Sequence, residues 1–125
     1  MKHLDLVDAI YLAQDYKNLE KVTCFIFSES NCAICKQMLP FVTSFENDYF
    51  EVVKVNDVDN HPFPMSVYPS AYFYIPNSER KMPIHRAGGG TKEDVQFEIE
   101  SCIESFVSNK DYEQVRQEKF NSNNR

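Results

Sequence analysis

A buried strand that leads into a pair of cysteines places the strongest constraint on how this chain can fold. Residues 22–27 form a β-branched and aromatic run without polar alternation, which is typical of a central strand covered on both faces. From residue 33 to about residue 47, apolar side chains recur at steps of three and four, which predicts a helix. Cys32 and Cys35 therefore stand where a central strand passes into a helix.

The rest of the chain predicts a single domain of the α/β class. Three further strands are expected, at residues 50–55, 71–75 and 82–86, and Pro83 places the last one at an edge. Further helices are expected over residues 4–19 and from Thr91, an N-cap candidate, to Phe106. The domain is expected to cover residues 1–108, and residues 109–125 are expected to form a polar, frayed C-terminal tail.

Charge and hydrophobic content exclude several classes of protein. The net charge of −6 argues against binding to nucleic acid or to an anionic membrane surface. The 10 Phe and 7 Tyr residues provide enough apolar area for one sizeable core, so a disordered chain is not expected. No apolar run approaches the roughly 20 residues that a membrane span needs, and no secretory signal is recognisable. We therefore expect a cytoplasmic protein in a reducing compartment.

The spacing of the two cysteines allows reversible oxidation. Thiols at positions i and i+3 of a helix face the same side, close enough for a disulfide. Unpaired N–H groups at the helix N-terminus favour the thiolate, and Lys36 adds a nearby positive charge. Cys32, nearer the terminus, should be more acidic and attack a substrate disulfide, and Cys35 should resolve the mixed disulfide.

The main alternative for this pair is half of a zinc site. Such a site needs two more ligands, but Cys24 lies in the apolar strand and Cys102 on the inner face of the last helix. Both are expected to be buried as small hydrophobic residues. His61 and His85 lack ligand spacing with a neighbour. We therefore favour redox chemistry and expect neither a metal nor another cofactor.

The order of these segments resembles the thioredoxin family over about residues 19–107. The matching segments are Phe25-Ile26-Phe27, Cys32-Ala33-Ile34-Cys35-Lys36, Pro40 and Tyr68-Pro69-Ser70. The resemblance implies a thioredoxin-like fold, with a central mixed four-stranded sheet flanked by helices; the helix over residues 4–19 would be an addition at the N-terminus.

The resemblance also implies an activity and the residues that carry it. The chain would reduce protein disulfides as a thiol-disulfide oxidoreductase of cell redox homeostasis, with Cys32 as nucleophile and Cys35 as resolving cysteine. Its implied partners are disulfide-containing proteins and an unidentified reductase or thiol donor. The implied substrate-contacting residues are Tyr68, a cis Pro69, Ala33 and Ile34.

Four positions depart from members named thioredoxin. Asn31 stands where those members have Trp, and Ala33-Ile34 stands where they have Gly-Pro. Ile26 occupies the position of a buried carboxylate that is implied to help move the proton of the resolving thiol. Substrate and reductase preferences therefore do not transfer, and here the proton must pass through water or another group.

Two alternative functions stay open at this stage. One is a thioredoxin-like protein-binding module without redox activity, which the missing Trp and carboxylate favour. The other is a glutaredoxin-like enzyme that uses glutathione, because residues 88–90 are three glycines before the last helix. Their spacing from Pro69 is longer than in glutaredoxins, so we expect the glycines to form a tight turn.

Overall fold

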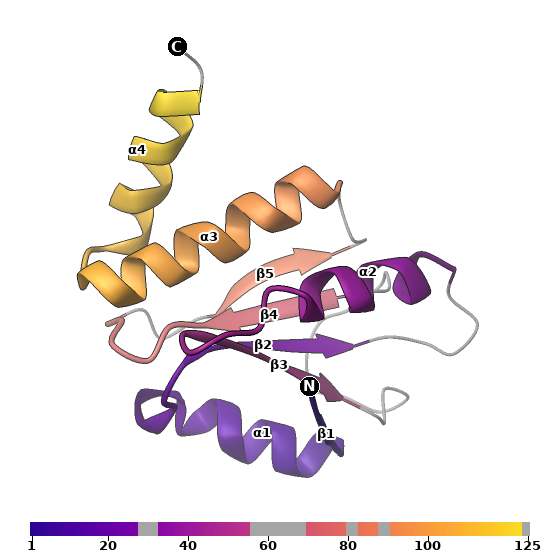
Figure 1. The fold of residues 1–125 in the computed structure, drawn as a ribbon. Coiled ribbons are helices and arrows are strands. Elements are labelled where there is room, and N and C mark those ends of the chain that lie inside the picture. The colour runs from indigo at the N-terminus through magenta and orange to yellow at the C-terminus, as the bar shows by residue number, and fades with distance from the viewer. Residues whose placement is uncertain (28–32, 56–69, 80–82, 88–90, 124–125) are drawn as a thin grey trace.

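The computed structural model describes residues 1–27, 33–55, 70–79, 83–87 and 91–123. In this part of the chain, five strands form one mixed sheet in the order β1-β3-β2-β4-β5 (Figure 1). The strands are β1 (Lys2–Leu4), β2 (Val22–Phe27), β3 (Phe50–Val55), β4 (Ser70–Tyr74) and β5 (Ile84–Ala87). The helices are α1 (Leu6–Gln14), α2 (Ala33–Thr43), α3 (Lys92–Ser108) and α4 (Tyr112–Asn123). The chain belongs to the α/β class.

Strand β2 is central and covered on both faces, as its composition predicts. It pairs in parallel with β3 and antiparallel with β4, and all six of its residues are buried. Because successive side chains of a strand point to opposite faces, β2 contributes to two cores. Cys24 and Ile26 lie in one core, and Phe25 and Phe27 lie in the other. Helices α2 and α3 cover one face of the sheet and α1 covers the opposite face (Figure 1).

The expected N-terminal helix is present but shorter than residues 4–19. It begins after Asp5, whose side chain accepts a hydrogen bond of 2.9 Å from the Asp8 N–H, as an N-cap does. It ends at Gln14, and a 3-10 turn follows at Tyr16–Asn18. No helix in the described part of the chain is both long and apolar enough to cross a membrane.

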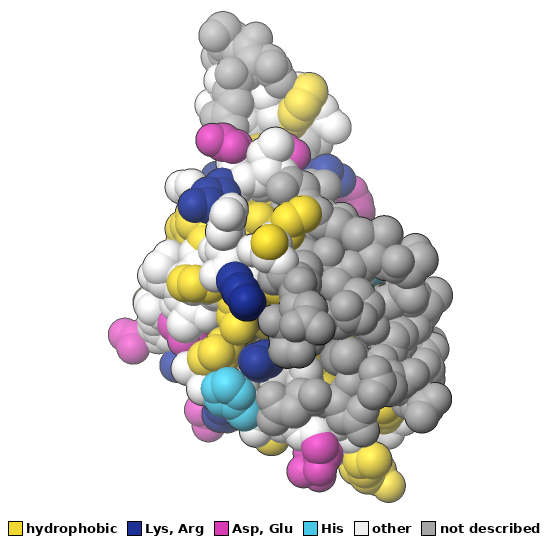
Figure 2. Space-filling view, turned by 90° about the vertical axis from the view of Figure 1, so that its right-hand side faces the viewer, with side chains coloured by type: hydrophobic (Ala, Val, Ile, Leu, Met, Phe, Trp, Pro, Cys, Tyr) yellow, Lys and Arg dark blue, Asp and Glu magenta, His cyan; other side chains and the backbone are white. Residues whose placement is uncertain are grey.

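The expected frayed tail instead contains helix α4. Tyr112 and Val115, in its first two turns, are buried, and α4 packs against α3. Beyond this contact, α4 projects from the body as a narrow lobe (Figures 1 and 2). The helix was missed because two apolar residues three positions apart are too few for a periodic pattern, so its packing against α3 determines its place.

The sheet has five strands in the described part of the chain, so the prediction of four is wrong. The additional strand, β1, pairs in parallel with β3, with Lys2 opposite Val53 and Leu4 opposite Val55. Its three residues are mostly exposed and show no alternation. A strand this short carries no sequence signal of its own, and its pairing partner defines it.

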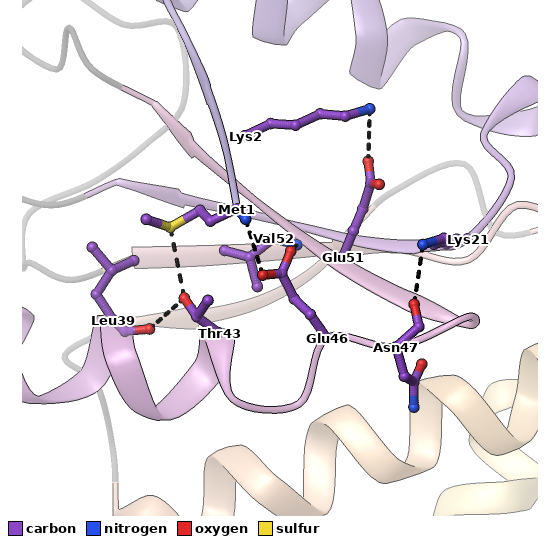
Figure 3. Close-up of polar contacts among 9 residues, drawn as sticks. All are labelled: Met1, Lys2, Lys21, Leu39, Thr43, Glu46, Asn47, Glu51 and Val52. Carbon is purple, nitrogen blue, oxygen red and sulfur yellow. Dashed lines mark hydrogen bonds and ion pairs between the residues drawn. The ribbon is translucent and has the colours of Figure 1, made fainter.

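Ion pairs and a hydrogen bond join Met1 to the segment between α2 and β3, join that segment to β3, and join Lys2 of β1 to β3 (Figure 3). The Met1 amino group lies 3.0 Å from the Glu46 carboxylate, which also accepts a hydrogen bond of 3.0 Å from the Val52 N–H. Lys2 lies 3.3 Å from Glu51 on β3. These contacts supplement the backbone pairing with β3 that sets the register of this three-residue edge strand.

Candidate functional site

Cys35 lies in the first turn of α2, the helix that follows the central strand. Buried residues recur in α2 at Cys35, Met38 and Val42, the spacing of one helical face, so the sulfur of Cys35 faces the sheet. Only 3% of Cys35 is exposed, whereas 52% of its neighbour Ile34 is exposed. The helix therefore directs the cysteine inward and presents Ile34 to solvent.

The cysteines of the chain differ in chemical state. Cys35 is disulfide-bonded, whereas Cys24 and Cys102 are thiols outside any disulfide. Both thiols are fully buried in the core beneath α2 and α3, as the sequence predicts. Burial raises the pKa of the Cys24 thiol far above its ordinary value, so this sulfur stays protonated and unreactive. Cys32 lies outside the described residues.

Strand β4, which follows the implied substrate-contacting residues Tyr68 and Pro69 in the sequence, begins beside the end of β2. Ser70, the first residue of β4, pairs with Phe27, the last residue of β2, and both are buried. The chain thus enters β4 at the same edge of the sheet at which it leaves β2 toward α2. Tyr68 and Pro69, the predicted substrate-contacting residues before Ser70, lie outside the described residues.

The charge at the start of α2 is suited to a thiolate. The first turn of the helix holds no acidic side chain, so nothing in that turn offsets the partial positive charge of the helix N-terminus. Ala33 and Lys36 are both exposed, so the Lys36 amino group is free of the core. The predicted contributions of the helix terminus and of Lys36 are therefore compatible with the placement of these residues.

Ile26, which stands where members named thioredoxin carry a buried carboxylate, is apolar and closely packed. Ile26 is 1% exposed and stands opposite Lys54 on β3 and Ala71 on β4. Ile26 brings no acidic or basic group into the core, so this side chain cannot relay a proton.

The histidine considered as a metal ligand has a structural partner. The His85 ring on β5 stacks on the Tyr72 ring of β4, with centroids 4.3 Å apart and planes inclined by 6°. Burial lowers the pKa of His85 below its usual value. Among the described residues, no three His, Cys, Asp or Glu side chains gather in a way that could hold a metal ion. His61 lies outside this part of the chain.

Sequence reasoning missed a buried polar pair that joins α3 to α4. The Tyr112 hydroxyl donates a hydrogen bond to the Glu98 carboxylate, and both side chains are buried. Burial and this hydrogen bond raise the pKa of Tyr112 well above its ordinary value. Helical spacing offered a signal, because Glu98 stands three residues after Val95 and four before Cys102, on the buried face of α3.

Comparison of the sequence with protein-family models and with curated proteins finds no match. The site is therefore interpreted from its own geometry and chemistry.

Proposed function

We propose that this protein is a thioredoxin-like thiol-disulfide oxidoreductase that reduces protein disulfides. One observation carries the proposal: Cys35 is disulfide-bonded in the first turn of the helix that follows the central strand. The other two described cysteines are buried thiols, and we propose Cys32 as the partner of Cys35. The elements β2, α2, β3, β4, β5 and α3 also follow one another in the order that the resemblance implies.

The burial of Cys35 supports a division of roles between the two cysteines. A sulfur that is 3% exposed is poorly placed to meet a second protein, so we assign the attack on substrate to Cys32. The Cys32 thiolate attacks one sulfur of the substrate disulfide, which forms a mixed disulfide and releases the other substrate sulfur as a thiolate. Cys35 then attacks the Cys32 sulfur, forms the intramolecular disulfide and releases the second substrate thiolate. The substrate gains two electrons, and an external thiol donor must restore the dithiol.

The surroundings of Cys35 support the assigned substrate contacts. Ile34, 52% exposed, offers an apolar contact next to the disulfide, and Ala33 is exposed beside it. The pairing of Ser70 with Phe27 supports a role for Tyr68 and Pro69, which directly precede Ser70 in the sequence. A substrate segment held there by main-chain hydrogen bonds would lie near Cys32.

The apolar Ile26 sets this protein apart from members of the family that carry an acid at that position. Without an acid there, the proton of the resolving thiol passes to water or to another group, and we expect slower resolution than in those members. The same feature favours one alternative, a protein-binding module without redox activity.

A cytoplasmic location is part of the proposal, because reduced cysteine pairs are maintained there.

The test is the reduction potential of the protein, measured by counting thiols after equilibration in dithiothreitol or glutathione buffers. We expect a reversible two-electron transition at about −230 mV or below, as for a cytosolic reductase. Cys32→Ser and Cys35→Ser should each abolish the transition, and Cys102→Ala, which alters a thiol outside the site, should keep it. A potential of about −120 to −180 mV would instead indicate an oxidant or isomerase.

A second measurement separates the enzyme from the binding module. The Cys32→Ser/Cys35→Ser variant should lose all disulfide reduction with a small model disulfide protein as substrate. If no transition occurs at any buffer potential, the enzyme proposal is wrong. Unchanged binding of a partner by the double variant would then support the binding module.

A further inference from the structure

Helix α1 is apolar on its outer side as well as on the side that packs against the sheet. Seven of its nine residues are apolar. Ala9 and Ala13 are buried in the core that it shares with the sheet, whereas Val7 and Tyr11 are 59% and 68% exposed. In the described part of the chain, α1 is the only α-helix on its face of the sheet (Figure 1). A helix that is apolar all round is normally buried, so the outer side of α1 is suited to a partner.

The exposed residues of α1 form a stripe along the helix. Tyr11 stands four residues after Val7, a spacing that makes two residues neighbours on a helix surface. Asp8 precedes Tyr11 by three residues and Asp15 follows it by four, so both acids share its side of the helix. At the lower edge of Figure 2, where α1 lies, hydrophobic and acidic side chains stand side by side. We call Val7, Asp8, Tyr11 and Asp15, all of them exposed, the outer stripe of α1.

The acids of this region have no cationic partner among the described residues. Residues 4–16 contain three acidic side chains and no basic one, so they contribute −3 to the net charge of −6. Asp5 and Asp15 accept hydrogen bonds from neutral N–H groups three residues away. No ion pair between described residues includes an acid of this segment, and Lys17, the next residue, pairs instead with Glu79 at 3.3 Å. These carboxylates can therefore receive a cation from outside the chain.

We propose that the outer stripe of α1 binds a basic amphipathic helix of another protein. Val7 and Tyr11 would contact the apolar stripe of that helix, as in the packing of two helices face to face. Lys or Arg side chains beside that stripe would pair with Asp8 and Asp15, and one of them would lie over the exposed ring of Tyr11. Because α1 and α2 cover opposite faces of the sheet, this surface is separate from the cysteine site and does not depend on its redox function (Figure 1).

Charge selects this occupant. The net charge of −6 attracts a basic partner and favours its approach. The same charge disfavours a second copy of the chain, which would bring further acids against Asp8 and Asp15. Nucleic acid and anionic lipid are disfavoured for the same reason. The nine residues of α1 span about 14 Å, so the contact is small and the complex should be weak and transient.

The binding of three synthetic peptides, measured by fluorescence anisotropy, tests the proposal. The first is a helical peptide with a stripe of leucines flanked by Lys and Arg. The second keeps the leucines and carries Glu in place of every Lys and Arg. The third has the composition of the first in a scrambled order without a stripe. We expect saturable binding of the first peptide that weakens with rising salt. The other two should bind about tenfold more weakly or not at all, because each lacks either the charge or the apolar contact.

Variants of the outer stripe test its residues against matched controls. Asp8→Asn with Asp15→Asn should raise the dissociation constant of the first peptide about threefold to tenfold, because two exposed charge pairs are lost. Asp48→Asn with Glu93→Gln is the control: it removes two exposed acids outside α1, and Glu93, like Asp8, lies in the first turn of a helix. It should change the dissociation constant less than twofold. Tyr11→Leu should weaken binding about twofold to fivefold, and Tyr11→Phe, which keeps the ring, should not.

Several results would overturn the proposal. Equal binding of the first and third peptides would mean that charge alone attracts them, without the apolar stripe. Equal effects of the two double variants would mean that the acids of α1 play no particular part. Tighter binding of the second peptide, or no saturable binding of the first by the wild type, would also overturn it. Circular dichroism and thermal melts of every variant show whether the fold is kept.

Discussion

The hydroxyl of Tyr112 makes a buried hydrogen bond whose removal has a calculable effect on stability. It donates to Glu98, and the two side chains are 4% and 1% exposed, so water cannot take its place. The substitution Tyr112→Phe keeps the ring and its packing and deletes the donor. A hydrogen bond to a charged group contributes about 1.5–3 kcal/mol, which is the expected loss in the free energy of unfolding.

The expected shift of the melting temperature equals this loss of free energy divided by the entropy of unfolding, which depends on the size of the chain. For 125 residues, an unfolding entropy of about 2.1 cal/mol/K per residue gives about 0.26 kcal/mol/K. The midpoint of Tyr112→Phe should therefore fall by about 6–11 °C. Urea titration and thermal melts followed by circular dichroism measure both quantities. Tyr11→Phe, at a tyrosine of α1 that is 68% exposed, is the control and should change stability by less than about 0.5 kcal/mol.

A double-mutant cycle isolates the contribution of the pair. Glu98→Leu alone removes the acceptor, and Glu98→Leu with Tyr112→Phe removes both partners together. Because a matched apolar pair needs no hydrogen bond, the double variant should be more stable than the sum of the single losses predicts, by about 1–3 kcal/mol. Equal melting temperatures of Tyr112→Phe and the wild type would refute this prediction. A double variant whose loss of stability equals the sum of the two single losses would also refute it.

Three further predictions follow from single groups. Because the pKa of Tyr112 is raised in the folded state, the unfolded state loses its phenolic proton first as pH rises past about 10. Wild-type stability in urea should therefore decrease above that pH, and Tyr112→Phe should decrease less; parallel curves would contradict this. The Cys24 thiol, whose pKa burial raises, should resist iodoacetamide in the native reduced protein and react in urea. Rapid labelling of the native protein, read by peptide mass spectrometry, would count against this. Thr91 Oγ1 accepts a hydrogen bond of 3.1 Å from the Asp94 N–H, so Thr91→Ala should cost about 1 kcal/mol in urea titrations and Thr91→Ser much less. Equal losses in the two variants would argue against the cap.

Elements with a strong local pattern were predictable from the sequence. Residues 22–27 form a strand buried on both faces because their composition suits no other environment. Helix α2 begins at Ala33 and α3 follows Thr91, because apolar periodicity and a capping side chain act over one or two turns. The position of Cys35 in the first turn of α2 was predictable for the same reason.

Features that depend on distant partners were decided by the tertiary structure. The three residues of β1 form a strand only because β3 offers an edge, and α4 is placed by the buried contacts of Tyr112 and Val115 with the body. Glu98 is charged by type yet buried, because a tyrosine 14 residues later donates to it. The neighbourhood of Cys35 likewise depends on the pairing of Ser70 with Phe27, residues 43 positions apart in the sequence. Sequence patterns report the environment of a residue along its own helix or strand, whereas these features arise from contacts that form only when separate elements pack together.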